Sequence, residues 1–282
     1  MEGVDFDMIQ RQKKLLSNQS QVSATHKKFL EDYKKNRTKI RIAQWAIFIT
    51  FILLWELSTR LGWINSFIFS SPSRVIKTIA EMSRDGTLFY HTGITLLETF
   101  LSFALVIFIG LLVSILLWWN DNIAKVLEPY LVILNSLPKT ALAPIFIVWL
   151  GNNMKTIIVA AVSVAVFGSI ITLYSNFQSV EEDKLKLIYT FGGTKKDILF
   201  KVILPSNLPT IISVMKVNIG LSLVGVIIGE FLAAKAGLGY LIIYGSQVFK
   251  LDWVIMSIVI LCIVATGLYG ILSYVEKRVK RN

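Results

Sequence analysis

Cysteine and histidine are scarce in this sequence of 282 residues, which contains one cysteine and two histidines. The single cysteine, Cys262, cannot form a disulfide within the chain, and its place inside an apolar run favours packing over thiol chemistry. His26 and His91 have no metal-ligand partner at a useful spacing. We therefore expect no metal site, no cofactor and no catalytic residue.

A phosphate-binding loop is missing as well. The segment GGTK, which begins at Gly192, resembles one superficially, but it lacks the G-x-x-x-x-G-K-S/T spacing and does not follow a strand. The chain is therefore not expected to hydrolyse ATP alone. An integral-membrane enzyme is disfavoured because His and acid clusters are missing. An ion-coupled secondary carrier is disfavoured because the sequence shows no internal repeat.

Charged residues make up only 17% of the sequence, whereas 54% of it is hydrophobic and the mean hydropathy is +0.64. A soluble domain needs more polar surface, so the bilayer is the expected solvent. A helix needs about 20 apolar residues to cross the hydrocarbon, and backbone groups in lipid bond within their own helix. The sequence thus predicts an all-α membrane protein. Six runs are long enough to be spans: residues 42–61, 93–119, 130–150, 156–174, 210–234 and 253–275.

Lysine and arginine are distributed unevenly between these spans. Twenty of the 29 lie in residues 1–41, in residues 179–205, at Lys125 and at the C-terminal end, against seven near the opposite ends of the spans. The excess marks the cytoplasmic side, so both termini are predicted to be cytoplasmic. A six-span domain over residues 42–275 then lies between the basic tail and a short C-terminal tail, 276–282. The net charge of +11 follows from this topology, and nucleic-acid binding is not inferred.

Two polar segments flank the first span. The first apolar run begins only at residue 42, after a polar, lysine-rich tail, so it does not resemble a cleaved signal sequence. Its part HKKFLEDYKKNRTKIR fits either a short interfacial helix or a solvated arm. After the span, Ser71 and Pro72 begin a segment to Arg84 with apolar residues at helical spacing. This pattern predicts an amphipathic helix on the outer membrane surface, in preference to a loop.

Proline and glycine mark two irregular spans. The third span contains Pro129, Pro138 and Pro144. It is therefore predicted to kink where neighbouring helices or a water-filled cavity satisfy the freed carbonyls. The fifth span contains Gly220, Gly225 and Gly229. Their spacing predicts that a neighbouring helix approaches closely.

A charged segment, residues 179–209, separates the fourth and fifth spans. Ser179 with Glu182 fits the capping pattern, in which a hydroxyl caps one backbone amide and the acid three residues later reaches back. Thr194 with Asp197 fits it too, so two short helices are expected.

The same segment contains residues that end helices. Gly192-Gly193 is predicted to supply the left-handed residue that closes the first short helix. Pro205, which lacks an amide hydrogen, is predicted to end the second. The sequence thus predicts a helical hairpin on the cytoplasmic face that offers a docking surface to another protein.

Five ionisable residues lie inside the predicted spans: Glu56, Glu98, Lys139, Lys216 and Glu230. A charge at the bilayer centre costs at least about 2.5–3.5 kcal/mol on insertion scales, so such side chains usually face a cavity or one another. Glu56 and Lys216 lie near span ends, where snorkelling is favoured. Lys139 and Glu230 lie deeper and either line a polar translocation route or form a structural ion pair. Glu98 stays undecided between these interpretations.

Several fragments resemble a known family when taken together. Gly192 is followed after eleven residues by Leu204-Pro205 within KLKLIYTFGGTKKDILFKVILPSNLP, and the fragments FSSPSRV, LPKTALAPIFIVWLG and GEFLAAKAGLGYLI follow the family's order and spacing. Over about residues 42–275 the chain resembles the transmembrane subunit of type I ABC importers, in particular the nitrate, sulfonate and taurine branch of binding-protein-dependent permeases. Where the family's EAA loop has Glu-Ala-Ala, this chain has Lys186-Leu187-Ile188.

The resemblance implies the type I ABC importer fold, with six transmembrane helices in the cell (inner) membrane and a cytoplasmic coupling loop at 179–205. Two such non-catalytic subunits, most simply a homodimer, pair in the lipid bilayer. Two ABC ATP-binding subunits contact the loops, and an extracytoplasmic solute-binding protein delivers the solute. The residues implied in coupling to the ATPase are Leu185, Ile188, Phe191, Gly192, Gly193, Thr194, Leu204 and Pro205. The candidates for the translocation path are Lys139, Glu230 and Glu98.

Two questions stay open at this point. Leu185, Ile188 and Phe191 form an apolar ridge that either fills a groove on a partner or packs under the chain's own spans. The substrate is expected to be a small anion of the alkanesulfonate, taurine or nitrate type, which Lys139 suits if it faces the cavity. The alternative is a thiamine-precursor pyrimidine, riboflavin or an aromatic compound, which other relatives carry.

Overall fold

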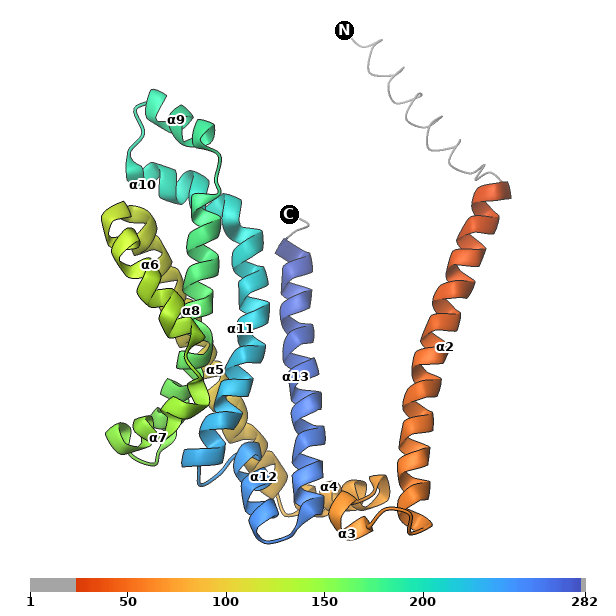
Figure 1. Cartoon of the computed structure of the whole chain (residues 1–282). Coiled ribbons are helices and arrows are strands. Elements are labelled where there is room, and N and C mark those ends of the chain that lie inside the picture. Colours follow the sequence, from red (N-terminus) through yellow and green to blue (C-terminus); the bar gives the residue numbers. More distant parts are fainter. Residues whose placement is uncertain (1–23, 280–282) are drawn as a thin grey trace. The chain divides into compact units, whose positions relative to one another are not determined.

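The computed structural model describes residues 24–279, and within that range helix is the only regular secondary structure. Residues 1–23 of the predicted N-terminal tail and 280–282 of the C-terminal tail lie outside the described residues. The chain divides into two compact units, residues 1–64 and 65–282, each described by itself. The helices of the second unit (Figure 1) are α3 (Ser66–Phe69), α4 (Pro72–Arg84), α5 (Thr87–Trp119), α6 (Asp121–Ser136), α7 (Lys139–Leu150), α8 (Met154–Gln178), α9 (Glu182–Thr190), α10 (Lys195–Ile198), the π-helical turn η1 (Leu199–Ile203), α11 (Leu204–Ala233), α12 (Leu238–Gln247) and α13 (Leu251–Val279).

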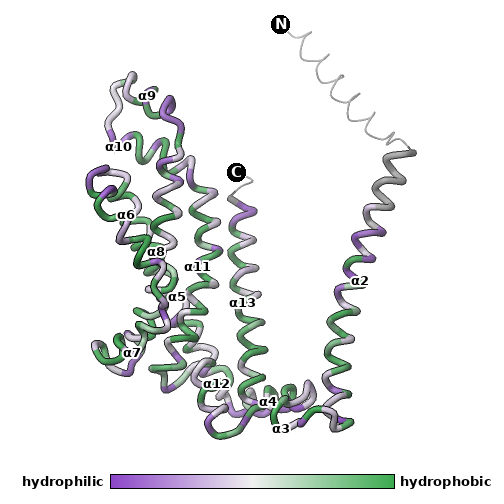
Figure 2. Tube along the Cα trace, in the orientation of Figure 1, coloured by the Kyte–Doolittle hydropathy of each residue, from purple (hydrophilic) through white to green (hydrophobic). Residues whose placement is uncertain are grey.

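The first unit contains one long helix, α2 (Ala24–Arg60), of 37 residues. At 1.5 Å per residue it is about 55 Å long, which exceeds the thickness of the hydrocarbon core. Figure 2 shows hydrophilic residues in the coloured stretch of this helix nearest the N-terminus and mostly hydrophobic residues farther along it. The described part of the tail is therefore one helix with the first span. Glu56 pairs with Arg60 on this helix, with Nε and Oε1 2.7 Å apart, and so its charge is balanced near the span's end.

Three long helices, α5, α8 and α11, form the core of the second unit, and α8 packs against both of the others. A Cβ atom at Gly225 of α11 would lie 2.6 Å from the Cα of Ala161 on α8, and one at Gly229 would lie 2.9 Å from the Cα of Ile157. Side chains at these positions would push the two helices apart. The predicted close approach is confirmed at Gly225 and Gly229, whereas Gly220 faces open space and takes no part.

Hydrogen bonds between side chains and neighbouring helices also join the core. The Ser114 hydroxyl on α5 donates to the carbonyl of Ile170 on α8 at 3.1 Å. Asn218 of α11 donates through Nδ2 to the Ser169 hydroxyl of α8 at 2.5 Å. Because an unpaired polar group is costly in an apolar interior, these bonds favour one register of the three helices.

An ion pair joins α13, the last helix of the second unit, to α11. Lys216 Nζ lies 2.7 Å from Glu276 Oε2, and the two side chains are 17% and 15% exposed. The same ammonium group lies 4.7 Å from the ring centroid of Tyr269, where a cation–π contact forms. Lys216 therefore forms an interhelical ion pair in place of the predicted extension toward the membrane surface.

The third predicted span is broken. The helices α6 and α7 meet at Leu137-Pro138 with a bend of 96°. Pro138 has no amide hydrogen and disfavours helical geometry at the residue before it, which confirms the predicted kink. Pro129 and Pro144 are accommodated inside α6 and α7. Of the described helices, five are long and apolar enough to cross a membrane, and the bent pair makes a sixth if it counts as one span.

At the opposite end from the α9–α10 hairpin, α4 is anchored to the start of α13. The Ser71 hydroxyl accepts from the Arg74 amide and Pro72 is the first helical residue, which confirms the predicted helix start. The Arg74 guanidinium donates to Asp252 Oδ2 from Nη2 at 2.7 Å and from Nε at 3.2 Å. The Ser70 hydroxyl donates to Asp252 Oδ1 at 2.5 Å. The fragment FSSPSRV is thus a structural anchor for the amphipathic helix.

Two features differ from the expectation. The helix α12 was not predicted: a turn precedes Leu238, but ten helical residues follow it. Cys262 of α13 is exposed, because one side of a span faces lipid and not protein. Its thiol therefore does not pack inside the helix bundle.

Candidate functional site

The hairpin of α9 and α10 projects from one end of the second unit, and α4 and α12 lie at the other end (Figure 1). Beneath it lies the hairpin-base cluster, a group of buried apolar residues from α8, α10, η1 and α11. Its members are Leu173, Phe177, Ile198, Leu199, Ile203 and Val214. The cluster packs the hairpin against the ends of the spans.

The turn between α9 and α10 requires glycine. Gly192 has φ +75°, and its amide donates to the carbonyl of Tyr189 at 2.9 Å. The Gly193 amide donates to the carbonyl of Ile188 at 2.9 Å, and a Cβ at Gly193 would overlap the Ile188 side chain. These bonds satisfy carbonyls that the end of α9 leaves free. The predicted left-handed closure of the first short helix is confirmed at Gly192.

One of the two predicted helix caps is present. The Thr194 hydroxyl accepts from the Asp197 amide while the Asp197 carboxylate accepts from the Thr194 amide, so the capping box of α10 is confirmed. The box predicted at Ser179 is wrong. Ser179 instead follows the last residue of α8, and its hydroxyl donates to the carbonyl of Asn176 at 2.8 Å. The helix α9 begins after Glu181 without a side-chain cap.

The predicted helix end at Pro205 is wrong. The chain continues from α10 through η1 into α11, and Leu204 and Pro205 are the first two residues of α11. Pro205 has no amide hydrogen to donate within this continuous helix, and the π-helical turn before it accommodates the missing bond. The preceding turn η1 is π-helical, a wider turn that is frequent at functional sites. The hairpin is therefore joined to the fifth span by continuous helix.

The three residues of the apolar ridge of α9 lie in two different environments, two of them packed and one exposed. Leu185 and Ile188 pack against the hairpin-base cluster, as the second of the two interpretations predicted. Phe191 is 82% exposed and is not among the residues that pack against the cluster. Leu187 and Tyr189, which sequence reasoning did not select, are 55% and 54% exposed. The exposed apolar surface of the hairpin is thus formed by Leu187, Tyr189 and Phe191, which we call the hairpin surface.

Lys195 links the hairpin to α5, and sequence reasoning missed it. Its Nζ donates to the carbonyl of Trp119, the last residue of α5, at 2.7 Å. The ammonium also lies 5.4 Å and 5.8 Å from the rings of Trp118 and Trp119. A lysine that caps a helix C-terminus satisfies a free carbonyl and interacts favourably with the helix dipole.

At the end of α5 farther from the hairpin a second polar group of residues is buried, which we call the outer junction because of its distance from the hairpin. The Glu230 carboxylate, 1% exposed, accepts from the Thr95 hydroxyl at 2.7 Å and from the Gly239 amide at 2.5 Å. Thr95 in turn accepts from the Leu238 amide at 2.8 Å. His91 Nδ1 accepts from the Gly237 amide at 2.9 Å. These bonds hold the turn before α12 against α5 and explain the fragment GEFLAAKAGLGYLI.

Glu98 lies next to this junction but is not part of its hydrogen-bond network with the turn. Its carboxyl group faces the Glu230 carboxyl group at hydrogen-bonding range, and the residue is 2% exposed. Its Oε2 atom is buried with no hydrogen-bond partner among the described residues. Glu230 and Glu98, two of the three predicted path residues, are thus brought together.

Lys139, the third predicted path residue, lies elsewhere, at the break between α6 and α7. Its Nζ donates to the carbonyls of Leu134 and Asn135 at 2.5 Å and 2.8 Å. It also lies 5.7 Å from the ring of Phe167. Two of its three donors therefore satisfy the carbonyls that end α6, which leaves one for any other ligand.

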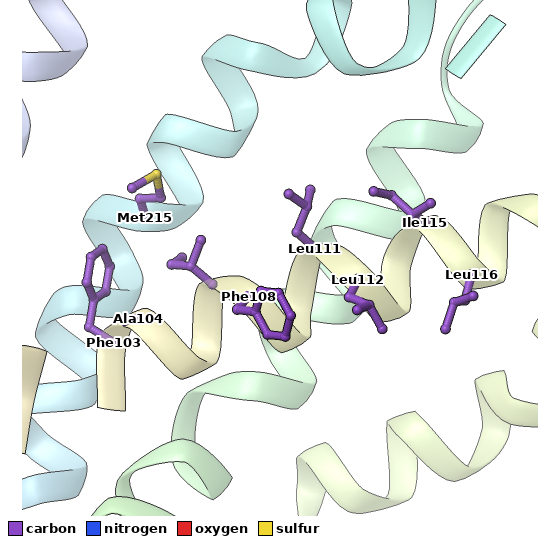
Figure 3. A pocket seen from close by; sticks show the side chains of 9 residues that line it. Phe103, Ala104, Phe108, Leu111, Leu112, Ile115, Leu116 and Met215 are labelled. Carbon is purple, nitrogen blue, oxygen red and sulfur yellow. The ribbon is translucent and has the colours of Figure 1, made fainter. Parts of the chain in front are cut away.

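Two hollows lie along α5. One is a groove of about 620 Å³ whose lining comes from α5 and Met215 of α11 and contains no charged side chain (Figure 3). Such a surface suits lipid chains or another apolar helix and cannot recognise a polar solute. The other, of about 350 Å³, lies between α5, the start of α8 and the end of α11. Glu98 forms part of its wall.

Comparison with known proteins agrees with this geometry. Residues 106–281 match the family described as "Binding-protein-dependent transport system inner membrane component". The chain is 30% identical over 193 residues to the formylaminopyrimidine transport permease protein ThiX of Halalkalibacterium halodurans, an alignment that covers 68% of this chain and 76% of ThiX. It is 26% identical over 213 residues to the putative aliphatic sulfonates transport permease protein SsuC of Bacillus subtilis, with 76% and 77% covered.

The fold agrees as well. A crystal structure of a bacterial ABC transporter involved in the import of the acidic polysaccharide alginate contains a chain that matches 89% of this one over 99% of its own length, with a TM-score of 0.60 and 14% identity. At 14% identity this similarity supports the fold alone. The family is shown by the sequence match, which covers more than half of the chain. This multi-pass membrane protein therefore belongs to the binding-protein-dependent transport system inner membrane components, the permease subunits of ABC importers.

Proposed function

We propose that this chain forms half of the solute pathway of an ATP-driven importer and that its α9–α10 hairpin docks on a separate ATP-binding subunit. The observation that carries the proposal is the build of the hairpin. Its turn is fixed by Gly192, its second helix by the Thr194–Asp197 capping box, and its inner side by the hairpin-base cluster. A segment held so firmly that still exposes Phe191 offers a preformed contact to a partner.

The hairpin surface determines the kind of partner. Burial of an exposed Leu, Tyr or Phe side chain contributes about 1.5–3 kcal/mol, so Leu187, Tyr189 and Phe191 suffice to anchor the hairpin in an apolar groove. Lys186, which replaces the family's glutamate, lies 3.2 Å from Glu182 and 3.8 Å from Asp183 on the same helix. Because its charge is balanced within α9, docking rests on the apolar side chains.

The orientation follows from charge. The hairpin and the C-terminal end of α13 lie at the same end of the second unit (Figure 1), and Lys277 and Arg278 are in the last turn of α13. Basic residues concentrate on the cytoplasmic side of membrane proteins. We therefore assign the hairpin and the C-terminal end of α13 to the cytoplasm and the end with α4 and α12 to the exterior, where a solute-binding protein would dock. The N-terminal tail is proposed to be cytoplasmic on the separate ground of its own basic residues.

Movement of the hairpin would reach the outer end through α5. Lys195 and the hairpin-base cluster hold the inner end of α5 to the hairpin, and the outer junction holds its outer end to the turn before α12. When two ATP-binding subunits close, they would draw the hairpins of two permease copies together and tilt α5 with them. The pathway between the copies would then open outward, and ATP hydrolysis would reset it.

The solute is proposed to be small and to carry an amino group. The relative ThiX is named for formylaminopyrimidine and SsuC for aliphatic sulfonates, a class that includes the amino-bearing taurine. A bare anion is less favoured, because two donors of Lys139 are already used on α6 and because Glu98 and Glu230 place acid groups near the outer end.

Cysteine labelling tests the orientation and the docking. In a Cys262→Ser background, Phe191→Cys should react with an impermeant maleimide only in inside-out vesicles and should cross-link to a co-expressed ATP-binding subunit. Phe89→Cys is the matched control, because Phe89 is 68% exposed at the outer end of α5. It should react with the maleimide only in right-side-out vesicles and should not cross-link to the ATP-binding subunit. Labelling of Phe191→Cys from outside, or uptake without any ATP-binding subunit, would overturn the proposal and favour an ion-coupled carrier.

A further inference from the structure

We propose that the 350 Å³ pocket beside the outer junction binds the amino group of the transported solute through Glu98. This inference rests on the proposed function, whose solute it specifies. The pocket lies between Ile94 and Leu97 of α5, Ile157 of α8 and the segment after Ala233. Its volume is at the lower end of the range for small-molecule sites, which is about 300–1,000 Å³.

Glu98 has a carboxyl oxygen in this region that accepts no hydrogen bond from the described residues. Both carboxylate oxygens of Glu230 are engaged, one by the Thr95 hydroxyl and the other by the Gly239 amide. The Oε2 atom of Glu98 is buried with no hydrogen-bond partner among the described residues. A buried acceptor without a partner is costly, and the cost is relieved when a ligand supplies the missing donor.

The neighbouring carboxyl group determines the sign of the ligand. Glu98 and Glu230 face one another at hydrogen-bonding range, and two carboxyl groups this close share one proton and carry a single negative charge. A protonated amine or an N–H donor near Glu98 stabilises the pair, whereas an anion is repelled by it. The floor of the pocket therefore selects for amino groups.

The rest of the wall suits a small apolar frame. Ile94, Leu97 and Ile157 present hydrocarbon to the pocket, against which a heteroaromatic ring or a short methylene chain packs. Asn152 and Asn153 add two polar side chains to the wall. Because Glu98 is 2% exposed, binding as proposed requires its side chain to rotate toward the pocket when the solute binds. Lys235, exposed at the rim, adds a cation that would contact an acidic group on the same solute.

Direct binding to the full-length permease, purified with its ATP-binding subunit in nanodiscs and without ATP, tests the inference by isothermal titration calorimetry. The probes are two matched pairs: taurine with ethanesulfonate, and 4-aminopyrimidine with 4-methylpyrimidine. We expect the amino member of at least one pair to bind about tenfold more tightly, a difference of about 1.4 kcal/mol that one charge-assisted hydrogen bond can supply. Glu98→Gln should reduce that ratio to below about threefold, and Glu81→Gln on the exposed side of α4 is the matched control that should keep it.

Two further variants separate the remaining outcomes. If the solute is an aminosulfonate, Lys235→Met should weaken the binding of taurine and leave the binding of 4-aminopyrimidine unchanged. Leu97 lies on the rim with a side chain that is 53% exposed, so Leu97→Trp should narrow the pocket while Glu98 stays unchanged. We expect this variant to bind both amino probes more weakly. It keeps the inference testable even if Glu98→Gln does not fold. Equal binding of both members of each pair, or a ratio unchanged by Glu98→Gln and Leu97→Trp, would overturn the inference. Because binding is read without ATP, failure of the hairpin to couple to an ATPase would be seen separately.

Discussion

The ammonium group of Lys195 donates a hydrogen bond to the backbone carbonyl of Trp119, although the two residues are 76 positions apart in the sequence. The bond joins the first residue of α10 to the last residue of α5. Apolar contacts alone allow the two helix ends to slide past one another. The hydrogen bond is directional, so it fixes how the two ends meet. Lys195 is therefore well placed to pass motion of the hairpin on to α5.

Lys195→Met should reduce solute transported per ATP hydrolysed. A charge-assisted hydrogen bond contributes about 1.5–3 kcal/mol, so we expect the coupling ratio to fall by about tenfold while ATP hydrolysis continues. The ratio is measured in proteoliposomes that contain the permease, the ATP-binding subunit and the solute-binding protein. Lys196→Met, at the exposed neighbouring residue, is the control and should keep the ratio. A normal ratio in Lys195→Met would show that apolar packing alone transmits the motion.

How far the sequence predicts this arrangement depends on the range of the interaction. The spans, the kink at Pro138, the start of α4 at Ser71 and the turn at Gly192 all follow from local rules on hydropathy, proline, capping and positive φ. Each rule involves residues within a few positions of one another. These features of the fold were accordingly predictable.

The site residues depend on contacts between distant segments. The Lys195–Trp119 bond, the Arg74–Asp252 pair 178 positions apart and the hydrogen bond between Thr95 and Glu230 arise only once the helices are packed. A sequence shows which of these residues are charged but not which carbonyl or carboxylate they meet. The error at Pro205 has another cause, because the π-helical turn before it lets the helix continue where an α-helical register alone predicts a stop.

Gly192→Val should uncouple ATP hydrolysis from transport while membrane insertion stays normal. A Cβ at Gly192 meets no atom within 4 Å, so the effect comes from its φ of +75° alone, which a β-branched residue adopts at a cost of roughly 1–2 kcal/mol. Gly192→Asn should retain most transport, since asparagine tolerates this backbone conformation. Uptake and ATPase rates of the two variants are compared in proteoliposomes.

Gly86 provides a control of the same kind. It has φ +79°, and its Cβ would also meet nothing within 4 Å, but it lies between α4 and α5 at the other end of the unit. Gly86→Val should therefore carry a similar strain and leave the coupling ratio unchanged. Equal uncoupling by Gly86→Val and Gly192→Val would mean that general destabilisation, and not the hairpin, explains the loss.

Thr95→Val should destabilise the outer junction far more than Thr99→Val. Both threonines are fully buried on α5. The Thr95 hydroxyl donates to Glu230 and accepts from the Leu238 amide, so its loss leaves a buried carboxylate and a buried amide short of a partner, at a cost of about 2–4 kcal/mol. The Thr99 hydroxyl donates only to the carbonyl of Thr95 on its own helix, and its loss should cost about 1 kcal/mol or less. Thermal unfolding in detergent followed by circular dichroism gives the ranking, and equal melting temperatures would contradict the network.

Asp252→Asn should loosen α4 from α13. The Asp252 carboxylate accepts from both Arg74 and Ser70, and an asparagine in the same place offers one acceptor oxygen and turns an NH₂ group toward one of these donors. Because the Arg74 side chain is 42% exposed, solvent weakens the pair, and we expect a loss of about 1 kcal/mol. Glu81→Gln is the matched control, since its contact with Lys77 spans 3.8 Å between exposed side chains and should contribute less than about 0.5 kcal/mol. Hydrogen exchange of the α4 amides reads the local opening directly, and faster exchange in Asp252→Asn than in Glu81→Gln is the expected result. Identical exchange in the two variants would show that α4 is held by its apolar face, and the role of FSSPSRV as an anchor would be lost.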